Sequence, residues 1–183
     1  NFPVAMPSAN LSTSLSPVKA QDVFDEFKNK INIIVDGGQS KFGIESTVID
    51  LTGKPKILRP GIISSNEIKK CLNIHLSKKK STIRSPGMLK KHYSPGIPIK
   101  LNRIRGGKND AYITFGKKYK KKYNHFNLSK KSNLNEAASN LYKTFRLIKK
   151  RGFKKIQIAK IPSKGTGIAI NDRIKRAAKI KWN

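Results

Sequence analysis

Two residues that could bind an anion, Ser46 and Arg59, flank a stretch that the sequence folds back on itself. Residues 41–61 read KFGIESTVIDLTGKPKILRPG. The run STVIDL is rich in β-branched residues, TGKP is typical of a turn and KILR predicts a second short strand, so the stretch predicts a β-hairpin. This hairpin would carry Ser46 and Arg59 to the same end of the two strands. A hydroxyl beside a guanidinium, which offers a planar fork of donors, suits an anionic ligand.

Two loops hold further groups that could contact a ligand. Residues 7–17, PSANLSTSLSP, carry serines, a threonine and an asparagine between two prolines, which is typical of a turn-rich binding loop but also of ordinary loops. Residues 36–43, DGGQSKFG, could bring backbone N–H groups close to a phosphate. This second loop matches neither the Walker nor the dinucleotide-binding motif. From the residues alone, both a ligand site and plain loop chemistry stay open.

The cysteine and histidine residues do not predict a metal centre. His75, His92 and His125 are far apart in the chain and lack metal-ligand spacing. Cys71 is the only cysteine, which excludes an intrachain disulfide and a cysteine-based zinc site and favours a reduced, cytoplasmic protein. His92 stands beside Tyr93 between two Pro-Gly pairs in SPGMLKKHYSPG. Tyr93 could fasten this segment to a domain or contact a ligand, and the residues leave both interpretations open.

The elements that must position these groups fall into an α/β pattern with three parts. Residues 1–76 predict short strands at 2–6 and 31–36, a helix at 19–29 with Val23, Phe24 and Phe27 on its apolar face, the hairpin, and a capped helix at 64–72. Residues 77–96 have the composition of a linker. Residues 97–183 predict strands at 97–104, 110–116 and 154–162 and helices at 133–152 and 167–180. Strands alternating with helices indicate a small parallel α/β unit.

The composition adds a strong and uneven positive charge. The chain of 183 residues has a formal charge of +30, and residues 1–70 hold nine Lys/Arg against seven Asp/Glu, whereas residues 71–183 hold 31 against three. Such a surface would attract polyanions, which keeps a basic RNA-binding module without catalysis as an alternative function. A general bias toward lysine would explain the charge equally well. No apolar run approaches the roughly 20 residues that cross a bilayer, so no membrane partner is expected.

Five segments resemble, in order and spacing, the threonylcarbamoyl-AMP synthases of the YrdC-like superfamily: PSANLSTSLSP, DGG, GIESTVID, ILRPG and SPGMLKKHYSPGIP. The chain is more narrowly similar to the long form of the family, because GTGIAINDRIKRAA resembles the end of its second domain. The resemblance implies the later half of a YrdC-like twisted open α/β sheet domain at 1–76, a linker or lid at 77–96, and a small parallel α/β carboxy-terminal domain at 97–183.

The resemblance also implies a chemistry. In this family L-threonine, bicarbonate and ATP give threonylcarbamoyl-AMP and pyrophosphate, and a partner transferase complex uses the product to modify tRNA. Because the reaction requires mainly positioning and charge neutralisation, no catalytic side chain is expected, and Mg would accompany the ATP. The linker is expected to cover the labile intermediates.

The expected roles are assigned residue by residue. ATP is expected to contact the hydroxyls, guanidinium and ring of Ser8, Ser16, Arg59 and Tyr93. Threonine or its carbamate is expected at Ser46, with the backbone of Met6 nearby. Additional binding residues are expected at Asn10, Thr47 and His92.

Three departures and one rival accompany the resemblance. The family loop usually continues Ser-Gly, whereas this chain has Ser12-Thr13, which reduces the backbone freedom there. Asp172 stands before Arg173, where the family usually has Asn. The amino-terminal half of the family's catalytic domain is absent from these residues, so the fragment alone is expected to be inactive or nearly so. A hydrogenase-maturation carbamoyltransferase would share the fold, but it would need zinc-finger cysteines and an acylphosphatase region.

Overall fold

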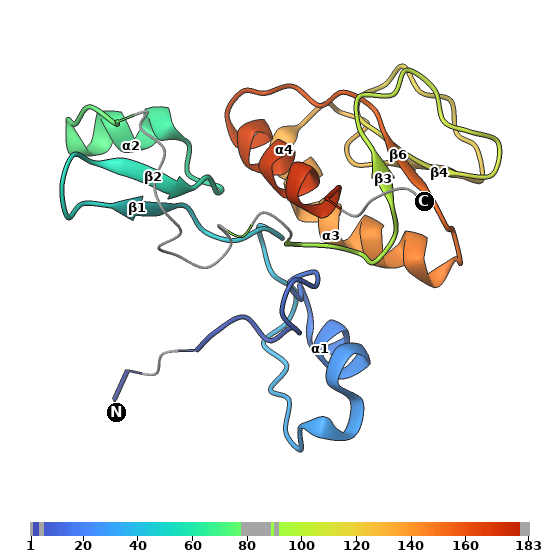
Figure 1. Ribbon diagram of the computed structural model, residues 1–183, viewed down its shortest axis with the longest axis horizontal. Helices are drawn as coiled ribbons and strands as arrows, with labels where there is room; N and C mark the ends of the chain where they lie inside the picture. Colours follow the sequence, from blue (N-terminus) through green and yellow to red (C-terminus); the bar gives the residue numbers. More distant parts are fainter. Residues whose placement is uncertain (1, 4–5, 78–88, 90–91, 180–183) are drawn as a thin grey trace.

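The computed structural model describes residues 2–3, 6–77, 89 and 92–179 (Figure 1). Its helices are α1 (Ala20–Phe27, followed by a 3-10 turn at Lys28–Lys30), α2 (Ser65–Leu72), α3 (Leu134–Lys150) and α4 (Thr166–Ala177). Its strands are β1 (Val48–Asp50), β2 (Lys56–Arg59), β3 (Ile99–Lys100), β4 (Ala111–Thr114), β5 (His125–Asn127) and β6 (Ile156–Ile158). The helices of the described residues lack the length and apolar character that a bilayer crossing requires.

The predicted hairpin and the helix after it are confirmed. Strands β1 and β2 pair antiparallel, with Val48 opposite Arg59. The Asp50 carboxylate accepts hydrogen bonds from the backbone N–H and the hydroxyl of Thr52 at 3.0 and 2.7 Å, which fixes the turn that follows β1. Helix α2 begins with a capping box, because the Ser64 hydroxyl accepts from the Glu67 N–H and the Glu67 carboxylate accepts from the Ser64 N–H.

The carboxy-terminal part forms a parallel four-stranded sheet in the order β3-β6-β4-β5. This confirms the predicted parallel α/β unit, although β5 was not predicted from the sequence. Helix α3 begins where the Asn133 side chain accepts from two backbone N–H groups, and it contacts α4. The spacing of Asn133 and Glu136 would allow a capping box, but the Glu136 carboxylate accepts from the Ser129 hydroxyl at 2.6 Å instead.

The two faces of this sheet are covered in different ways. Ala111 and Ile113 of β4 point into the core that contains the apolar stripes of α3 and α4. The alternate residue Tyr112 is equally buried, but its ring contacts Tyr119 and His125 and its hydroxyl bonds to the loop after β3. Because strand side chains alternate between faces, helices cover one face of the sheet and loops cover the other.

Two strands predicted in the first 40 residues are wrong for the described residues. Residues 31–36 form no strand, and the side chains of Ile33 and Val35 are 82% and 87% exposed. Phe2, Pro3 and Met6 also lie outside any strand, while residues 4 and 5 of that prediction fall outside the described part. A strand needs a neighbour to pair its backbone groups, and neither described sheet includes these segments. An apolar run alone does not reveal whether such a neighbour exists.

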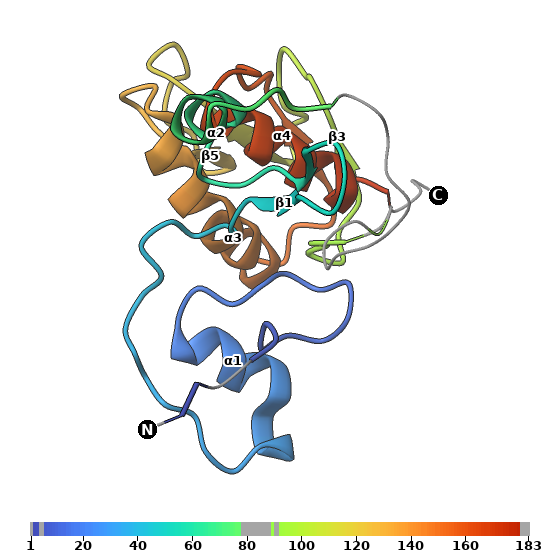
Figure 2. The same cartoon turned by 90° about the vertical axis from the view of Figure 1, so that its left-hand side faces the viewer.

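Helix α1 is confirmed, but its expected apolar face is buried only in part. The buried residue of α1 is Asp22, whereas Phe24 is 52% exposed. The carboxylate of Asp22 accepts from the Val18 N–H at 2.8 Å and faces Arg146 of α3 at 3.5 Å. These polar contacts tie α1 to Val18 and to α3. Figures 1 and 2 both show α1 on the side of α3, apart from the two sheets.

One apolar core joins the early and late parts of the chain. Leu15, Val18 and Ile44 pack with Tyr93 and with the residues of β3, β4, β6, α3 and α4. Gly43, at φ +67°, lies so close to α3 that a Cβ would come within 2.7 Å of the backbone of Ser139. Most of the 77–96 linker lies outside the described residues. The division of the chain at 76 and 96 therefore stays a prediction.

Candidate functional site

The end of the hairpin brings Ser46 and Arg59 together, as the sequence predicts. The Arg59 guanidinium donates to the Ser46 backbone carbonyl through Nε at 3.1 Å and to the Ser46 hydroxyl through Nη2 at 3.3 Å. Thr47 is fixed separately, because its hydroxyl donates to the carbonyl of Ile63 at 2.7 Å. Ser46 is exposed. A hydroxyl and a guanidinium therefore stand in contact at an accessible strand end.

A glycine makes this geometry possible. Gly61 is buried, and a Cβ at this position would lie 2.2 Å from the Thr47 nitrogen and 2.4 Å from the Ser46 carbonyl carbon. Both atoms belong to the backbone, so neither can rotate away as a side-chain end would. The returning chain can pass behind the serine and threonine only without a side chain.

Tyr93 is the buried aromatic residue at this site. Its side chain is 1% exposed, and its backbone adopts the left-handed conformation at φ +58°, which is rare for a bulky residue. The hydroxyl has no hydrogen-bond partner in the described part of the chain. Burial and the nearby Glu45 carboxylate raise the pKa of Tyr93, and the guanidinium groups of Arg173 and Arg59 oppose that rise. A buried, unpaired hydroxyl beside a cation is a group prepared for a further partner.

His92 stacks at a tilt on Tyr93 with ring centroids 4.0 Å apart. Its Nδ1 accepts a hydrogen bond from the Tyr93 backbone N–H at 3.0 Å. An Nδ1 that accepts must be unprotonated, and burial lowers the pKa of His92 accordingly. The ring is therefore neutral at physiological pH.

Behind the hairpin end lies the carboxylate of Glu45, whose side chain is only 14% exposed. It accepts from the Ser16 hydroxyl at 2.5 Å, from the Tyr142 hydroxyl at 3.1 Å and from Arg173 Nε at 2.7 Å. Burial alone would raise the pKa of Glu45, but Arg173 and these hydrogen bonds hold it below its usual range. Glu45 thus connects the amino-terminal loop, α3 and α4 immediately beside Ser46.

Arg173 links this carboxylate to Tyr93. The residue is fully buried, and its guanidinium lies 4.8 Å from the centroid of the Tyr93 ring in a cation–π contact. The neighbouring carboxylate of Asp172 accepts from Arg173 Nη1 at 2.8 Å and also from Arg176 Nε at 2.9 Å. The unusual aspartate of the sequence is therefore part of the support for Arg173.

The loop at 7–17 is tied to the segment that carries Tyr93. The Ser94 N–H donates to the Thr13 carbonyl at 3.0 Å, and Ser14 pairs with Ser94 in a parallel bridge. Thr13 adopts φ +70°. The position at which the sequence departs from glycine thus holds a left-handed conformation that glycine would adopt without strain.

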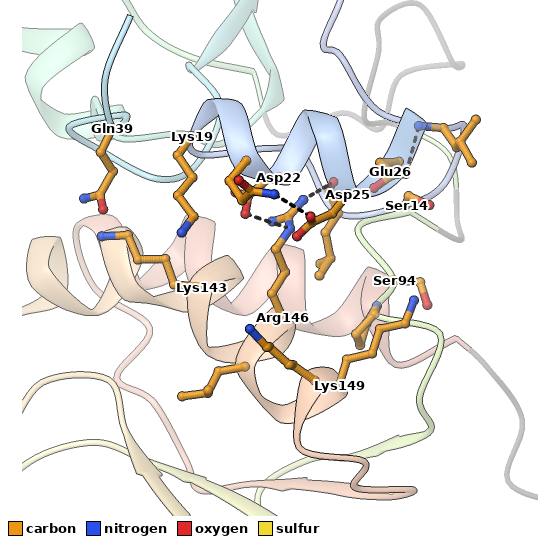
Figure 3. Close-up of a pocket in the computed structure, with 16 residues that line it drawn as sticks. Ser14, Lys19, Asp22, Asp25, Glu26, Gln39, Ser94, Lys143, Arg146 and Lys149 are labelled. Atoms are coloured by element: carbon orange, nitrogen blue, oxygen red, sulfur yellow. Dashed lines mark hydrogen bonds and ion pairs between the residues drawn. The ribbon is translucent and has the colours of Figure 1, made fainter. Parts of the chain in front are cut away.

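Arg146 of α3 holds the end of the same loop. Its guanidinium donates to the carbonyls of Leu15 and Ser16 at 2.9 and 3.0 Å and pairs with Asp22. Figure 3 shows Arg146 rising from α3 to reach α1 across a groove. The groove measures about 970 Å³ and contains neither Ser46 nor Arg59, although Ser14 and Ser94 belong to its lining. The groove is therefore separate from the hairpin end.

The remaining predicted binding residues differ in their exposure and in their hydrogen bonds. They are Met6, Ser8, Asn10 and Ser16. Met6 is 81% exposed and Ser8 is also exposed, both on the amino-terminal segment. Asn10 bonds within its own loop, through its backbone N–H to the Ser8 carbonyl and its side-chain amide to the Leu11 carbonyl. The Ser16 hydroxyl is buried and already donates to Glu45. Their expected ligand contacts stay predictions.

Sequence reasoning missed four residues that support this site: Glu45, Tyr142, Arg146 and Arg173. One signal could have indicated Arg173, because it shares the apolar stripe of α4 with Ile170 and Ile174. A charged residue in an apolar stripe needs a buried partner. The chain holds only ten acidic residues, so the search for that partner would have been short.

The carboxylates, histidines and cysteine of the described residues do not gather in any group of three that could hold a metal ion. The donors at the hairpin end are hydroxyls and a guanidinium. Such a set matches the oxygen atoms of an anion rather than a dedicated magnesium cage.

The fold and this site define a mixed α/β protein with an anion-suited hairpin end supported by a carboxy-terminal parallel sheet. Residues 63–179 match the family model described as threonylcarbamoyl-AMP synthase, C-terminal domain, and residues 1–61 match the Sua5/YciO/YrdC model described as telomere recombination. The chain belongs to the threonylcarbamoyl-AMP synthase C-terminal domain family.

Individual relatives agree with this assignment. A threonylcarbamoyl-AMP synthase of Pyrococcus abyssi is 33% identical over 96% of this chain and 58% of its own length. That of Schizosaccharomyces pombe is 39% identical over 63% of this chain and 31% of its own length. A crystal structure of P. abyssi Sua5 complexed with L-threonine superposes with a TM-score of 0.77 at 31% identity, over 94% of this chain and 56% of that one. The chain thus spans little more than half of the P. abyssi relative.

Proposed function

We propose that the protein to which this chain belongs is an L-threonylcarbamoyladenylate synthase. It would combine L-threonine, bicarbonate and ATP to give threonylcarbamoyl-AMP and pyrophosphate. The names of the relatives and the threonine complex of the P. abyssi structure support this proposal. The observation that carries it is the contact of Arg59 with Ser46 beside the unpaired hydroxyl of Tyr93.

The groups at the hairpin end meet the demands of this reaction. Displacement of pyrophosphate from the α-phosphate requires positioning and neutralised charge rather than a nucleophile from the protein. Arg59 supplies the cation for the phosphate, and Ser46 holds threonine or its carbamate. Tyr93 offers its hydroxyl to the nucleotide, and Thr47 and His92 line the same end.

The other expected contacts belong to the same proposal. Ser8, Asn10 and Ser16 contribute the amino-terminal loop to the nucleotide, and the Met6 backbone faces threonine. Mg²⁺ enters with ATP and is held by phosphate oxygens, because the neighbouring carboxylate of Glu45 is already paired with Arg173. The reaction would take place in the cytoplasm, and the product would pass to a tRNA-modifying transferase complex.

The segment around Tyr93 serves as the cover of the site. The carbamate and the acyl-adenylate are both labile in water, so their formation favours a site closed by the linker. The burial of Tyr93, its cation–π contact with Arg173 and the pairing of Ser94 with Thr13 support this role. In this proposal the catalytic part is residues 1–76 and the cover is residues 77–96. The support is residues 97–183.

The test is the release of pyrophosphate from ATP by the intact protein, with and without L-threonine and bicarbonate. Release should require both co-substrates and fall by about 100-fold or more in Arg59→Ala, because an electrostatic contact to the reacting phosphate is lost. Lys54→Ala, an exposed lysine at the turn of the same hairpin, is the matched control and should keep the wild-type rate. Release indifferent to threonine, or an unchanged Arg59→Ala rate, would refute the proposal.

A further inference from the structure

Eight exposed cations gather on two loops of the carboxy-terminal sheet, residues 101–109 and 115–124, which we call the two-loop surface. They are Arg103, Arg105, Lys108, Lys117, Lys118, Lys120, Lys121 and Lys122. None of them forms an ion pair with an acidic residue in the described part of the chain. Between residues 101 and 124 the sequence contains a single acid, Asp110, which accepts from the Gln157 amide at 2.6 Å. The positive charge of this surface is thus uncompensated.

The two loops are held together by buried polar side chains. The Tyr112 hydroxyl donates to the carbonyls of Arg103 and Ile104, both at 2.8 Å. The amide of Asn124, which is buried, donates to the carbonyls of Lys108 and Asp110 at 3.3 and 2.9 Å. Because these hydrogen bonds fix the loop backbones, the two-loop surface has a defined shape and its lysines do not lie on a flexible segment.

Aromatic rings lie among these cations. Tyr123 is 69% exposed, and its hydroxyl donates to the Lys108 carbonyl at 2.8 Å. Its ring stacks on Phe153 with centroids 6.4 Å apart, so it is held with much of its surface open to solvent. Lys118 Nζ lies 5.1 Å from the centroid of Tyr119.

A small hollow adjoins the stacked Tyr123–Phe153 pair. It measures about 330 Å³ and is lined by Asn109, Asp110 and residues 151–155, which include Arg151, Lys154 and Lys155. More cations therefore border the exposed ring. The hollow adjoins the carboxy-terminal end of α3, and Figure 1 shows the two loops at the end of the molecule opposite the β1–β2 hairpin.

We propose that the two-loop surface binds single-stranded RNA, with the lysines and arginines on the phosphates and Tyr123 stacked on a base. Unpaired cations along two neighbouring loops match the regular charge of a nucleic-acid backbone. An exposed aromatic ring among cations is the usual platform for an unpaired base, whereas an acidic protein surface would gain little from it. This function goes beyond the proposed synthase activity, whose own reaction involves no nucleic acid.

The alternative explanation for the charge is a general bias toward lysine in this chain. It predicts that lysines of these loops contribute no more to RNA binding than lysines elsewhere. The experiment therefore compares two variants of the intact protein with equal loss of charge. The loop variant carries Lys117→Gln, Lys118→Gln, Lys120→Gln and Lys121→Gln. The control variant carries Lys28→Gln, Lys30→Gln, Lys164→Gln and Lys175→Gln, four exposed lysines elsewhere. Binding of a labelled 20-nucleotide oligouridine is followed by fluorescence anisotropy between 50 and 200 mM salt.

The loop variant should bind at least tenfold more weakly than the control variant. The slope of log K against log salt should fall by about 0.7 for each phosphate contact removed, so by about 3 for four contacts. Pyrophosphate release should be the same in both variants, which separates this result from any failure of the synthase proposal. Equal weakening of the two variants, or no binding at 50 mM salt, would overturn the proposal.

A charge-neutral pair of variants distinguishes RNA from an acidic polypeptide. Tyr123→Ala removes the stacking platform and should weaken oligouridine binding by about tenfold, whereas Tyr123→Phe keeps the ring and most of the affinity. Poly-glutamate of equal charge should compete poorly. Equal competition by poly-glutamate, together with no effect of Tyr123→Ala, would show an acidic-protein surface instead and overturn the RNA proposal. Circular dichroism verifies that each variant is folded.

Discussion

The carboxylate of Glu45 accepts a 2.7 Å hydrogen bond from Arg173, a residue 128 positions later in the chain. Arg173 is fully buried and Glu45 largely so, and the pair stands between two functional groups of the hairpin end. Glu45 directly precedes Ser46, and the Arg173 guanidinium makes a cation–π contact with the ring of Tyr93. The carboxy-terminal helix α4 is thereby connected to both sides of the candidate site.

This connection predicts a large loss of stability when the arginine is neutralised. Arg173→Met leaves Glu45 buried without its cation, and we expect the free energy of unfolding to fall by about 3–5 kcal/mol in urea denaturation. Arg176→Met, the neighbouring and partly exposed arginine, is the control and should cost about 1 kcal/mol or less. The double variant Glu45→Gln with Arg173→Met should recover part of the loss. Similar losses for the two arginines would contradict a special role of the buried pair.

The stability should also depend on pH through Glu45. Its folded-state pKa lies below the value of an unfolded glutamate, so the ionised form is favoured by folding. The stabilisation is complete above the ordinary carboxyl range and is lost as the pH falls through the lowered folded pKa. Thermal unfolding measured between neutral and acidic pH should show this decline, and Glu45→Gln should flatten it while lowering the melting temperature at pH 7.

Tyr93 offers a test of whether its hydroxyl serves a ligand or the ring only fastens the linker. Tyr93→Phe removes a buried, unpaired hydroxyl, so the stability should stay constant or rise by about 1 kcal/mol. If the hydroxyl binds the nucleotide, kcat/KM for ATP should fall by about tenfold or more in the same variant. Tyr93→Ala should lose both stability and activity. Full activity of Tyr93→Phe would assign Tyr93 to packing alone.

Gly61 should tolerate no side chain. In Gly61→Ala the new Cβ would lie 2.2 Å from the Thr47 nitrogen, which must displace the backbone of Ser46 and Thr47. We expect a loss of about 1–3 kcal/mol or more and a raised KM for threonine. Gly53→Ala is the matched control, since a Cβ there meets nothing within 4 Å, and its effect should stay within about 0.5 kcal/mol. Equal effects of the two substitutions would argue against the close approach at Gly61.

The sequence by itself determined the features that depend on neighbours along the chain. The turn after β1 and the cap of α2 rest on hydrogen bonds between residues a few positions apart, and both appear as predicted. The hairpin also brought Ser46 to Arg59, because a tight turn and a strand register fix where two ends meet.

Only the tertiary structure decided the partners of Glu45, the burial of Tyr93 and the fate of residues 31–36. A local pattern states that a charge or an apolar run needs a partner, but it does not state which surface will supply one. Arg173 and Tyr142 reach Glu45 from positions 128 and 97 residues away, because the shared core packs α3 and α4 beside the hairpin end. Residues 31–36 look like a buried strand yet lie exposed, since no described strand stands beside them to pair with their backbone.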